Sequence, residues 1–293
     1  MLLALLRTMR PRQWTKNVFV FAGVFFDGRA FELVRLVHSL AAFAIFCLLS
    51  SAVYLINDLA DVEKDRQHPS KRHRPIASGD LKPSVAIWAA AVCMALSIAA
   101  AFALGTAFGI VSLAYLALMV TYSFWLKNIV IIDVMTIAMG FVLRVIAGTV
   151  AVEVTRFSPW LYVCSTLLAL FIAINKRRHE LLLLAEGADN HRSSLREYNL
   201  EFLDTMTSLV TATLLASYSF YTFSAPNLPA NHSMMLTIPF VLYGIFRYLY
   251  LVHARGLGGA PEEIVLSDKP MLVTLALWAL TAGLALYSPM FWQ

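Results

Sequence analysis

Long apolar runs alternate with short polar segments along almost the whole chain, and none shows the strict alternation of a barrel strand. A membrane-spanning helix needs about 20 mostly apolar residues. Helices are also favoured in lipid because each one satisfies its own backbone hydrogen bonds. Nine runs fit, the first being short: 17–27, 35–56, 84–104, 107–126, 129–152, 159–175, 205–224, 233–252 and 270–289. The pattern therefore predicts an all-α polytopic membrane protein with about nine transmembrane helices.

The basic residues predict how these helices face. If the N-terminus is cytoplasmic, the inner segments hold 18 Lys and Arg residues, whereas the outer loops hold 3. Cytoplasmic loops of membrane proteins carry such an excess. We therefore expect a cytoplasmic N-terminus and an external C-terminus. The two longest polar segments, 57–83 and 176–204, then become cytoplasmic loops of a single transmembrane domain spanning 1–293.

Composition agrees with this prediction. The 293 residues are 59% hydrophobic and 14% charged, with a mean hydropathy of +0.70, whereas soluble domains carry about 25% charged residues. The net charge of +5 follows from the topology and indicates no nucleic-acid partner. Cys47, Cys93 and Cys164 lie in apolar runs without a CxxC spacing, which excludes a thiolate zinc site and a disulfide scaffold. We also expect no cleaved signal peptide, because no basic residue precedes the first apolar residues.

A dense acidic run follows the predicted second span, where Asn57 precedes Asp58, Asp61 and Asp65. If the helix continues through this run, the three aspartates lie within about 60° of one another on one face. Carboxylates this close repel one another unless a cation neutralises them. Mg²⁺ binds one or two carboxylates together with substrate phosphates. We therefore predict a Mg²⁺ site at Asp58, Asp61 and Asp65, in preference to a solvated helix end paired with neighbouring basic residues.

The sequence NDLADVEKD at 57–65 resembles the first aspartate motif, NDxxDxxxD, of the UbiA superfamily of intramembrane prenyltransferases. The similarity continues through RPIASG at 74–79, YSFWLK at 122–127, and Asp133 with RVIAG at 144–148. It covers nearly the whole chain and implies a UbiA-like helical bundle. It also implies that Asp58, Asp61 and Asp65 are catalytic and hold a diphosphate through Mg²⁺ while the C–O bond to the transferred group breaks.

The chain departs from the family pattern after the sixth span, where a second aspartate motif is typical. Residues 175–180 are NKRRHE, so cations stand where acids are usual. A second Mg²⁺–carboxylate site is therefore not expected. The change suits a substrate with an additional phosphate, since Lys provides a point charge and Arg a bidentate donor. With RPRQWTKN at 10–17, HPSKRHR at 68–74 and GAPEEI at 259–264, the chain is similar to the decaprenyl-phosphate phosphoribosyltransferase branch.

This branch implies transfer of 5-phosphoribose from phosphoribosyl pyrophosphate (PRPP) to a polyprenyl phosphate, with release of pyrophosphate. It implies Mg²⁺ as the cofactor, the bacterial inner (plasma) membrane as the location, and a product that feeds arabinose donors for the cell wall. PRPP carries a pyrophosphate and a separate phosphate, which suits an acidic metal site beside a basic site. The acceptor phosphate is already an anion, so no general base is required. A homo-oligomer remains open.

The resemblance and the charges together give candidate substrate-binding residues at the cytoplasmic level. Asn57 orients the aspartates. The other candidates are Lys71, Arg72 and Arg74 for pyrophosphate, Tyr122 and Lys127 for a phosphate or ribose, and Lys16 with Asn17, or Lys176 with Arg177, for the 5-phosphate or the lipid phosphate.

Three basic features have alternative interpretations. Arg144 lies well inside the fifth span, where a lone cation costs at least ~2.5–3.5 kcal/mol. It must face protein or a polar cavity, and either substrate contact or a buried pair with Asp133 accounts for it. Arg247 in the eighth span has the same alternatives, with a structural role favoured. The run 176–178 is either a phosphate site or a cytoplasmic anchor.

Two other functions are compatible with the pattern to different degrees. A prenyltransferase of the same fold would move a polyprenyl group from its diphosphate to an aromatic acceptor, and the altered second motif disfavours it. A channel or transporter would need charges along a pathway at membrane depth. The charges of this chain gather instead at one face, so a channel is strongly disfavoured.

Overall fold

The computed structural model describes residues 1–293 except 68–70, 155–157, 186–192, 226–227, 259–260 and 292–293. All regular elements in the described ranges are helices. In chain order they are α1 (Leu2–Met9), η1 (Pro11–Phe21), α2 (Ala22–Phe26), α3 (Leu33–Ala60), α4 (Val62–Gln67), η2 (Lys71–His73), α5 (Pro75–Ser78), α6 (Pro83–Leu104), α7 (Thr106–Phe124), η3 (Leu126–Asn128), α8 (Ile132–Ala151), α9 (Pro159–Ala185), η4 (Ser193–Arg196), α10 (Leu200–Ser224), η5 (Ser233–Thr237), α11 (Ile238–Ala254), α12 (Pro261–Ser267) and α13 (Lys269–Phe291).

Seven helical segments within the described residues are long and apolar enough to cross a membrane. They are α3, α6, α7, α8, α9, η5 together with α11, and α13. The all-α, multi-pass prediction is therefore confirmed, whereas the count of nine is not. The long α10 falls outside this set because its many Thr, Ser and Tyr residues lower its hydropathy.

The predicted first span, 17–27, is not one α-helix. The 3₁₀ helix η1 and the five-residue α2 cover this stretch instead. Along this stretch the backbone passes very close to α8: a Cβ at Gly148 would lie 1.9 Å from the carbonyl oxygen of Val20. The polar side chain of Asn17, also in η1, is fully buried in the bundle.

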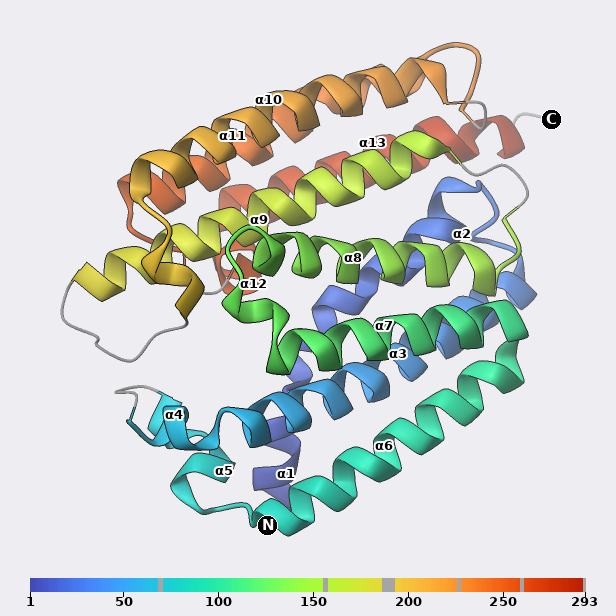
Figure 1. The fold of residues 1–293 in the computed structure, drawn as a ribbon. Coiled ribbons are helices and arrows are strands. Elements are labelled where there is room, and N and C mark those ends of the chain that lie inside the picture. Colours follow the sequence, from blue (N-terminus) through green and yellow to red (C-terminus); the bar gives the residue numbers. More distant parts are fainter. Residues whose placement is uncertain (68–70, 155–157, 186–192, 226–227, 259–260, 292–293) are drawn as a thin grey trace.

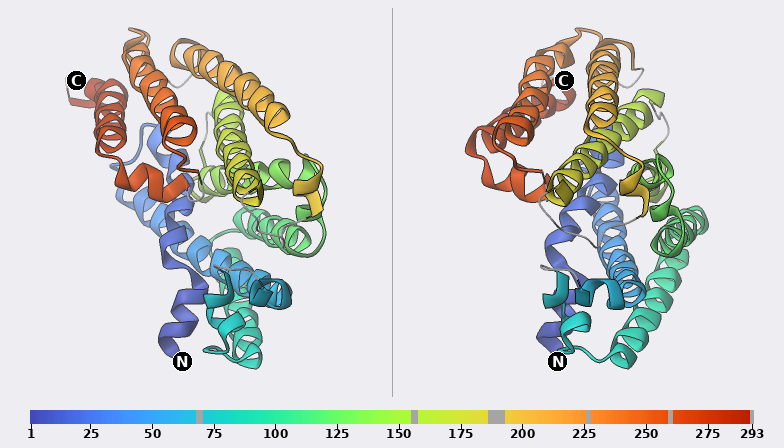
Figure 2. Two further views of the ribbon diagram at one scale, coloured as in Figure 1. Left: turned by 90° about the vertical axis from the view of Figure 1, so that its left-hand side faces the viewer. Right: turned by 60° about the vertical axis from the view of Figure 1, so that its left-hand side comes forward.

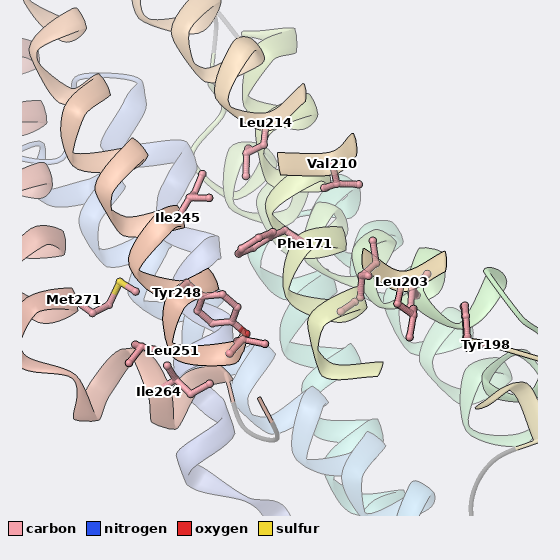
Figure 3. Packing of buried hydrophobic residues seen from close by; sticks show 14 of the residues in the cluster. Phe171, Tyr198, Leu203, Val210, Leu214, Ile245, Tyr248, Leu251, Ile264 and Met271 are labelled. Carbon is pink, nitrogen blue, oxygen red and sulfur yellow. The ribbon is translucent and has the colours of Figure 1, made fainter. Parts of the chain in front are cut away.

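Apolar side chains both fill the bundle and face outward. One core joins Phe171 of α9 with Tyr248 of α11 and Met271 of α13, as Figure 3 shows. A second core centres on Phe46 of α3 and includes residues of η1, α7 and α8. Trp88 is 74% exposed, as expected for a side chain that faces lipid. The bundle is thus apolar inside and apolar outside, as a membrane requires.

Polar segments from distant parts of the sequence meet at one end of the bundle. Figure 1 shows α4, α5, the C-terminal end of α9 and the N-terminal end of α10 at this end, while α2 lies at the other. The views in Figure 2 agree with this arrangement. The short helix η3 contacts η4 at this end. The described parts of the two long polar segments, 57–83 and 176–204, therefore share one end, which we call the polar end.

Candidate active site

The acidic end of α3 is the centre of the polar end. Asp58 is 2% and Asp65 3% exposed, so both carboxylates are buried. One nitrogen of Arg74, Nη1, lies 3.2 Å from Asp58 Oδ1 and 2.7 Å from Asp65 Oδ2. Arg10 contributes a second guanidinium, with Nη2 2.5 Å from the same Asp58 oxygen. Two acids and two arginines therefore alternate in one compact cluster.

Asp61 faces a different cation. Helix α3 ends at Ala60, and Asp61 lies in a turn with φ −101° and ψ 5° before α4 begins. The spacing predicts that the three aspartates share one face if the helix continues through them. The helix is broken at Asp61, so they do not lie on one continuous helix. Asp61 Oδ1 accepts a hydrogen bond from Lys127 Nζ at 2.5 Å, and Lys127 is itself buried. The break in the helix thus divides the acids between the arginines and a lysine from η3.

Local structure delivers the two arginines to this site. Arg10 caps α1 in the left-handed region, φ 53° and ψ 63°, and its guanidinium lies 4.9 Å from the centre of the Tyr54 ring. A cation over an aromatic face gains electrostatic stabilisation. Arg74 precedes Pro75, the first residue of α5, and is extended as residues before proline usually are. The local backbone conformation thus directs the side chains of both arginines toward Asp58 of α3.

The acidic cluster fits a divalent cation that is held by two carboxylates. Asp58 and Asp65 share one cationic nitrogen of Arg74, so their oxygens converge on a single positive position. Mg²⁺ typically takes one or two carboxylates and completes its shell with phosphates and water. Among the described residues, no group of three or more His, Cys, Asp or Glu side chains could hold a metal ion. Two converging carboxylates match the number of protein ligands that Mg²⁺ typically takes.

A second buried network lies at the C-terminal end of α9. Arg177 is 1% exposed and forms an ion pair with Asp133 of α8, Nε to Oδ2 at 2.8 Å, without hydrogen-bond geometry. Arg177 also pairs with Glu180 and donates to the Tyr122 hydroxyl at 3.2 Å. Breaking such a buried pair typically costs about 3–5 kcal/mol. Arg177 of α9 thus contacts Tyr122 of α7 and Asp133 of α8. A basic residue that only anchors the chain at the cytoplasmic face would not need these buried contacts.

Arg144 does not pair with Asp133. Its guanidinium donates to Asn17 Oδ1 at 2.8 Å, to the Gly140 carbonyl at 2.8 Å and to the Tyr115 hydroxyl at 2.7 Å. It also lies 4.8 Å from the centre of the Tyr115 ring. Asp133 lies three helical turns away and is already paired with Arg177. Hydrogen bonds therefore satisfy Arg144 inside the bundle and fix the amide of Asn17.

The remaining candidates lie around these networks. Arg247 bonds Asp268 at 2.8 Å, in line with a structural role, and this hydrogen bond lowers the pKa of Asp268. Arg72 is exposed beside His73. The other predicted side chains are half-buried at the same end: Lys16, Asn57, Lys71 and Lys176.

Several residues that complete the site are not predicted by the sequence patterns. Arg10 belongs to a recognised basic motif, but its contact with Asp58 bridges 48 residues of sequence. Glu180 stands beside Arg177 at helical spacing, and that spacing was a usable signal. Ser194 and Tyr198 carried no signal at all, yet their hydroxyls contact Lys127 and Asp133 respectively.

Known proteins similar in sequence identify the family of this chain. The profile of the UbiA prenyltransferase family matches residues 17–258. The chain belongs to this family. It is 35% identical to the decaprenyl-phosphate phosphoribosyltransferase of Corynebacterium glutamicum, over 98% of this chain and 88% of that protein. It is 33% identical to the protein of the same name from Mycobacterium tuberculosis, over 95% of this chain and 93% of that protein.

Solved structures of UbiA proteins share the fold. A UbiA homolog from Archaeoglobus fulgidus bound to GPP and Mg²⁺ superposes with a TM-score of 0.72 at 20% identity, over 97% of this chain and 99% of that one. The predicted UbiA-like bundle is therefore confirmed. As a member of the UbiA family with such relatives, the protein is a multi-pass membrane transferase.

Proposed function

We propose that this protein transfers 5-phosphoribose from PRPP to a polyprenyl phosphate, with release of pyrophosphate. The observation that carries the proposal is the mixed charge of the polar end. Three aspartates alternate there with Arg10, Arg74 and Lys127. PRPP needs both charges, because its pyrophosphate suits a metal–acid site and its 5-phosphate a basic one. The names of relatives that match over nearly the full length support the same reaction.

The proposed chemistry follows from what these residues do. As the C1–O bond breaks, the ribose becomes oxocarbenium-like and the departing pyrophosphate gains negative charge. Arg10, Arg74 and Lys127 bind and stabilise that charge with fixed hydrogen-bond donors. Mg²⁺, when held by Asp58 and Asp65, supplies further neutralisation of the leaving group. The acceptor phosphate already carries the attacking anion, so no side chain needs to remove a proton from it.

The substrates approach the site from different phases. The polyprenyl tail lies among the apolar side chains that the bundle presents to lipid, whereas PRPP is water-soluble. We place the polar end on the cytoplasmic side of a bacterial inner membrane, with the N-terminus inside, because the Lys and Arg residues gather there. The chain then acts as a single transmembrane domain, with segments 57–83 and 176–204 on the cytoplasmic side.

A transfer assay tests the proposal directly. Purified protein in detergent is incubated with Mg²⁺, a polyprenyl phosphate and PRPP labelled in the ribose, and label is counted in the lipid phase. We expect transfer that EDTA abolishes and that Asp61→Ala reduces about 10²–10³-fold. Glu63→Ala is the matched control, because the Glu63 side chain is 75% exposed on the same segment.

Two results contradict this proposal in different ways. Full turnover by Asp61→Ala would remove Asp61 and its pairing with Lys127 from the mechanism. An absence of ribose transfer, together with consumption of a polyprenyl diphosphate and an aromatic acceptor, would keep the fold and replace the proposed substrates with those of a prenyltransferase.

A further inference from the structure

The link between η3 and α8 contains a strained turn. Ile131 has φ 69° and ψ −47°, and the N–H of Ile132 donates to the carbonyl of Val130 at 2.8 Å. This hydrogen bond joins a carbonyl to the N–H two residues later. Together with the positive φ of Ile131 it defines the positive-φ form of the γ-turn, which is rare and strained. A β-branched residue is a genuine outlier at positive φ. Such conformations persist only where surrounding contacts hold them, and they concentrate at functional sites.

The Tyr198 hydroxyl holds this turn. It accepts a hydrogen bond from the Ile131 N–H at 2.7 Å and donates one to Asp133 Oδ1 at 2.7 Å. Tyr198 is 4% exposed, and its ring stacks on Phe202. Burial and the hydrogen bond to Asp133 both raise the pKa of Tyr198, so its hydroxyl stays protonated and able to donate. Asp133 is in turn paired with Arg177, which anchors the hydroxyl to α9.

A second hydroxyl from the same segment fixes η3 on the other side of the turn. Ser194 Oγ donates to the carbonyl of Lys127 at 2.9 Å, and Ser194 is fully buried. Residues 194–198 thus hold the backbone at both Lys127 and Ile131. The Lys127 side chain leaves this fixed backbone toward Asp61, with Nζ 2.5 Å from Oδ1.

We propose that Tyr198 and Ser194 are positioning residues for the transfer reaction. They hold the strained turn at Ile131 and thereby fix Lys127 against Asp61. The acidic motif after α3 and the segment after α9 are consequently coupled through η3, although they are far apart in the sequence. This inference rests on the proposed function of Lys127 as a ligand of the substrate, and Tyr198 itself touches no substrate.

The test is a set of variants of the full-length protein in detergent, assayed for ribose transfer. Tyr198→Phe removes both hydrogen bonds and retains the ring. We expect kcat/KM for PRPP to fall about 10–100-fold, as for other supporting residues around a site. In a Lys127→Ala background the same change has no further effect, because coupled residues are not additive. Ile131→Gly, which adopts positive φ without strain, restores part of the activity of Tyr198→Phe.

A matched control separates positioning from general loss of stability. Tyr218→Phe removes another buried hydroxyl with two partners, Thr237 at 2.6 Å and Trp278 at 2.8 Å. We expect this variant to keep wild-type kcat/KM. Equal losses in Tyr218→Phe and Tyr198→Phe, or an additive loss in the Lys127→Ala background, would overturn the proposal.

A readout without turnover distinguishes this inference from the proposed function. An amine-reactive reagent is applied to the detergent-solubilised protein, and modification of Lys127 is quantified by mass spectrometry. We expect faster modification in Tyr198→Phe than in wild type, because Lys127 is no longer fixed, and an unchanged rate in Tyr218→Phe. An unchanged rate in Tyr198→Phe refutes the positioning role. Faster modification in a protein that transfers no ribose retains the role and rejects the proposed substrate.

Discussion

At the scale of single residues, Arg74 is the cation that joins the two carboxylates of the acidic cluster. One of its nitrogens contacts both Asp58 and Asp65, two buried carboxylates that would otherwise face each other as like charges. The neighbouring Arg66 is exposed and pairs with Glu63, also exposed. The two arginines are eight residues apart and have different partners, and of the two only Arg74 forms ion pairs with Asp58 and Asp65.

This difference gives a prediction. Arg74→Ala is expected to lower kcat/KM for PRPP about 10²–10³-fold, the usual effect of removing one fixed donor. Arg74→Lys should recover only part of this loss, because an ammonium cannot reproduce the planar guanidinium. Initial rates of ribose transfer at several PRPP concentrations measure both effects, with Arg66→Ala as the control. Wild-type rates in Arg74→Ala, or an equal loss in Arg66→Ala, would show that the shared contact is unimportant.

At the scale of elements, the close passage of η1 past α8 fixes the interior of the bundle. Gly148 leaves no room for a side chain, since its Cβ would lie 1.9 Å from the Val20 carbonyl oxygen. The bond between Arg144 and Asn17 joins the same two elements. Backbone cannot rotate away as a side chain can, so the two elements would have to separate to admit one methyl group.

We therefore expect Gly148→Ala to lower the yield of folded protein and its thermal unfolding midpoint in detergent. Gly283→Ala on α13 is the matched control, because no atom lies within 4 Å of the added Cβ. That variant should be unchanged or slightly more stable, given the difference of about 1 kcal/mol in helix propensity between Gly and Ala. Equal midpoints for the two variants would mean that η1 and α8 tolerate separation.

The same elements show what the sequence could predict. The apolar runs 84–104 and 107–126 correspond closely to α6 and α7 (Pro83–Leu104 and Thr106–Phe124), because hydropathy depends only on local composition. The helix break at Asp61 and the close contact of Gly148 depend on packing against distant segments. The pairing of Lys127 with Asp61 spans 66 residues, and no periodicity encodes it.

At the scale of the whole molecule, the charges divide the bundle into two unlike ends. The polar end holds the acidic cluster and the Arg177 network, contributed by α3, α8 and α9 among others. At the opposite end, Arg35 contacts Asp27 and the Val152 carbonyl. Such asymmetry suits the proposed reaction, in which a water-soluble donor and a membrane lipid reach one site from their own phases.

The asymmetry leads to a prediction about orientation. Ser78 is exposed at the polar end, whereas Asn231 is exposed in the segment between α10 and η5. The native cysteines Cys47, Cys93 and Cys164 lie within membrane helices, so they give little background. In right-side-out bacterial vesicles, a membrane-impermeant maleimide should label Asn231→Cys at once and Ser78→Cys only after permeabilisation. The reverse order of labelling would place the polar end outside, where cytoplasmic PRPP cannot reach it, and would contradict both the orientation and the proposed donor.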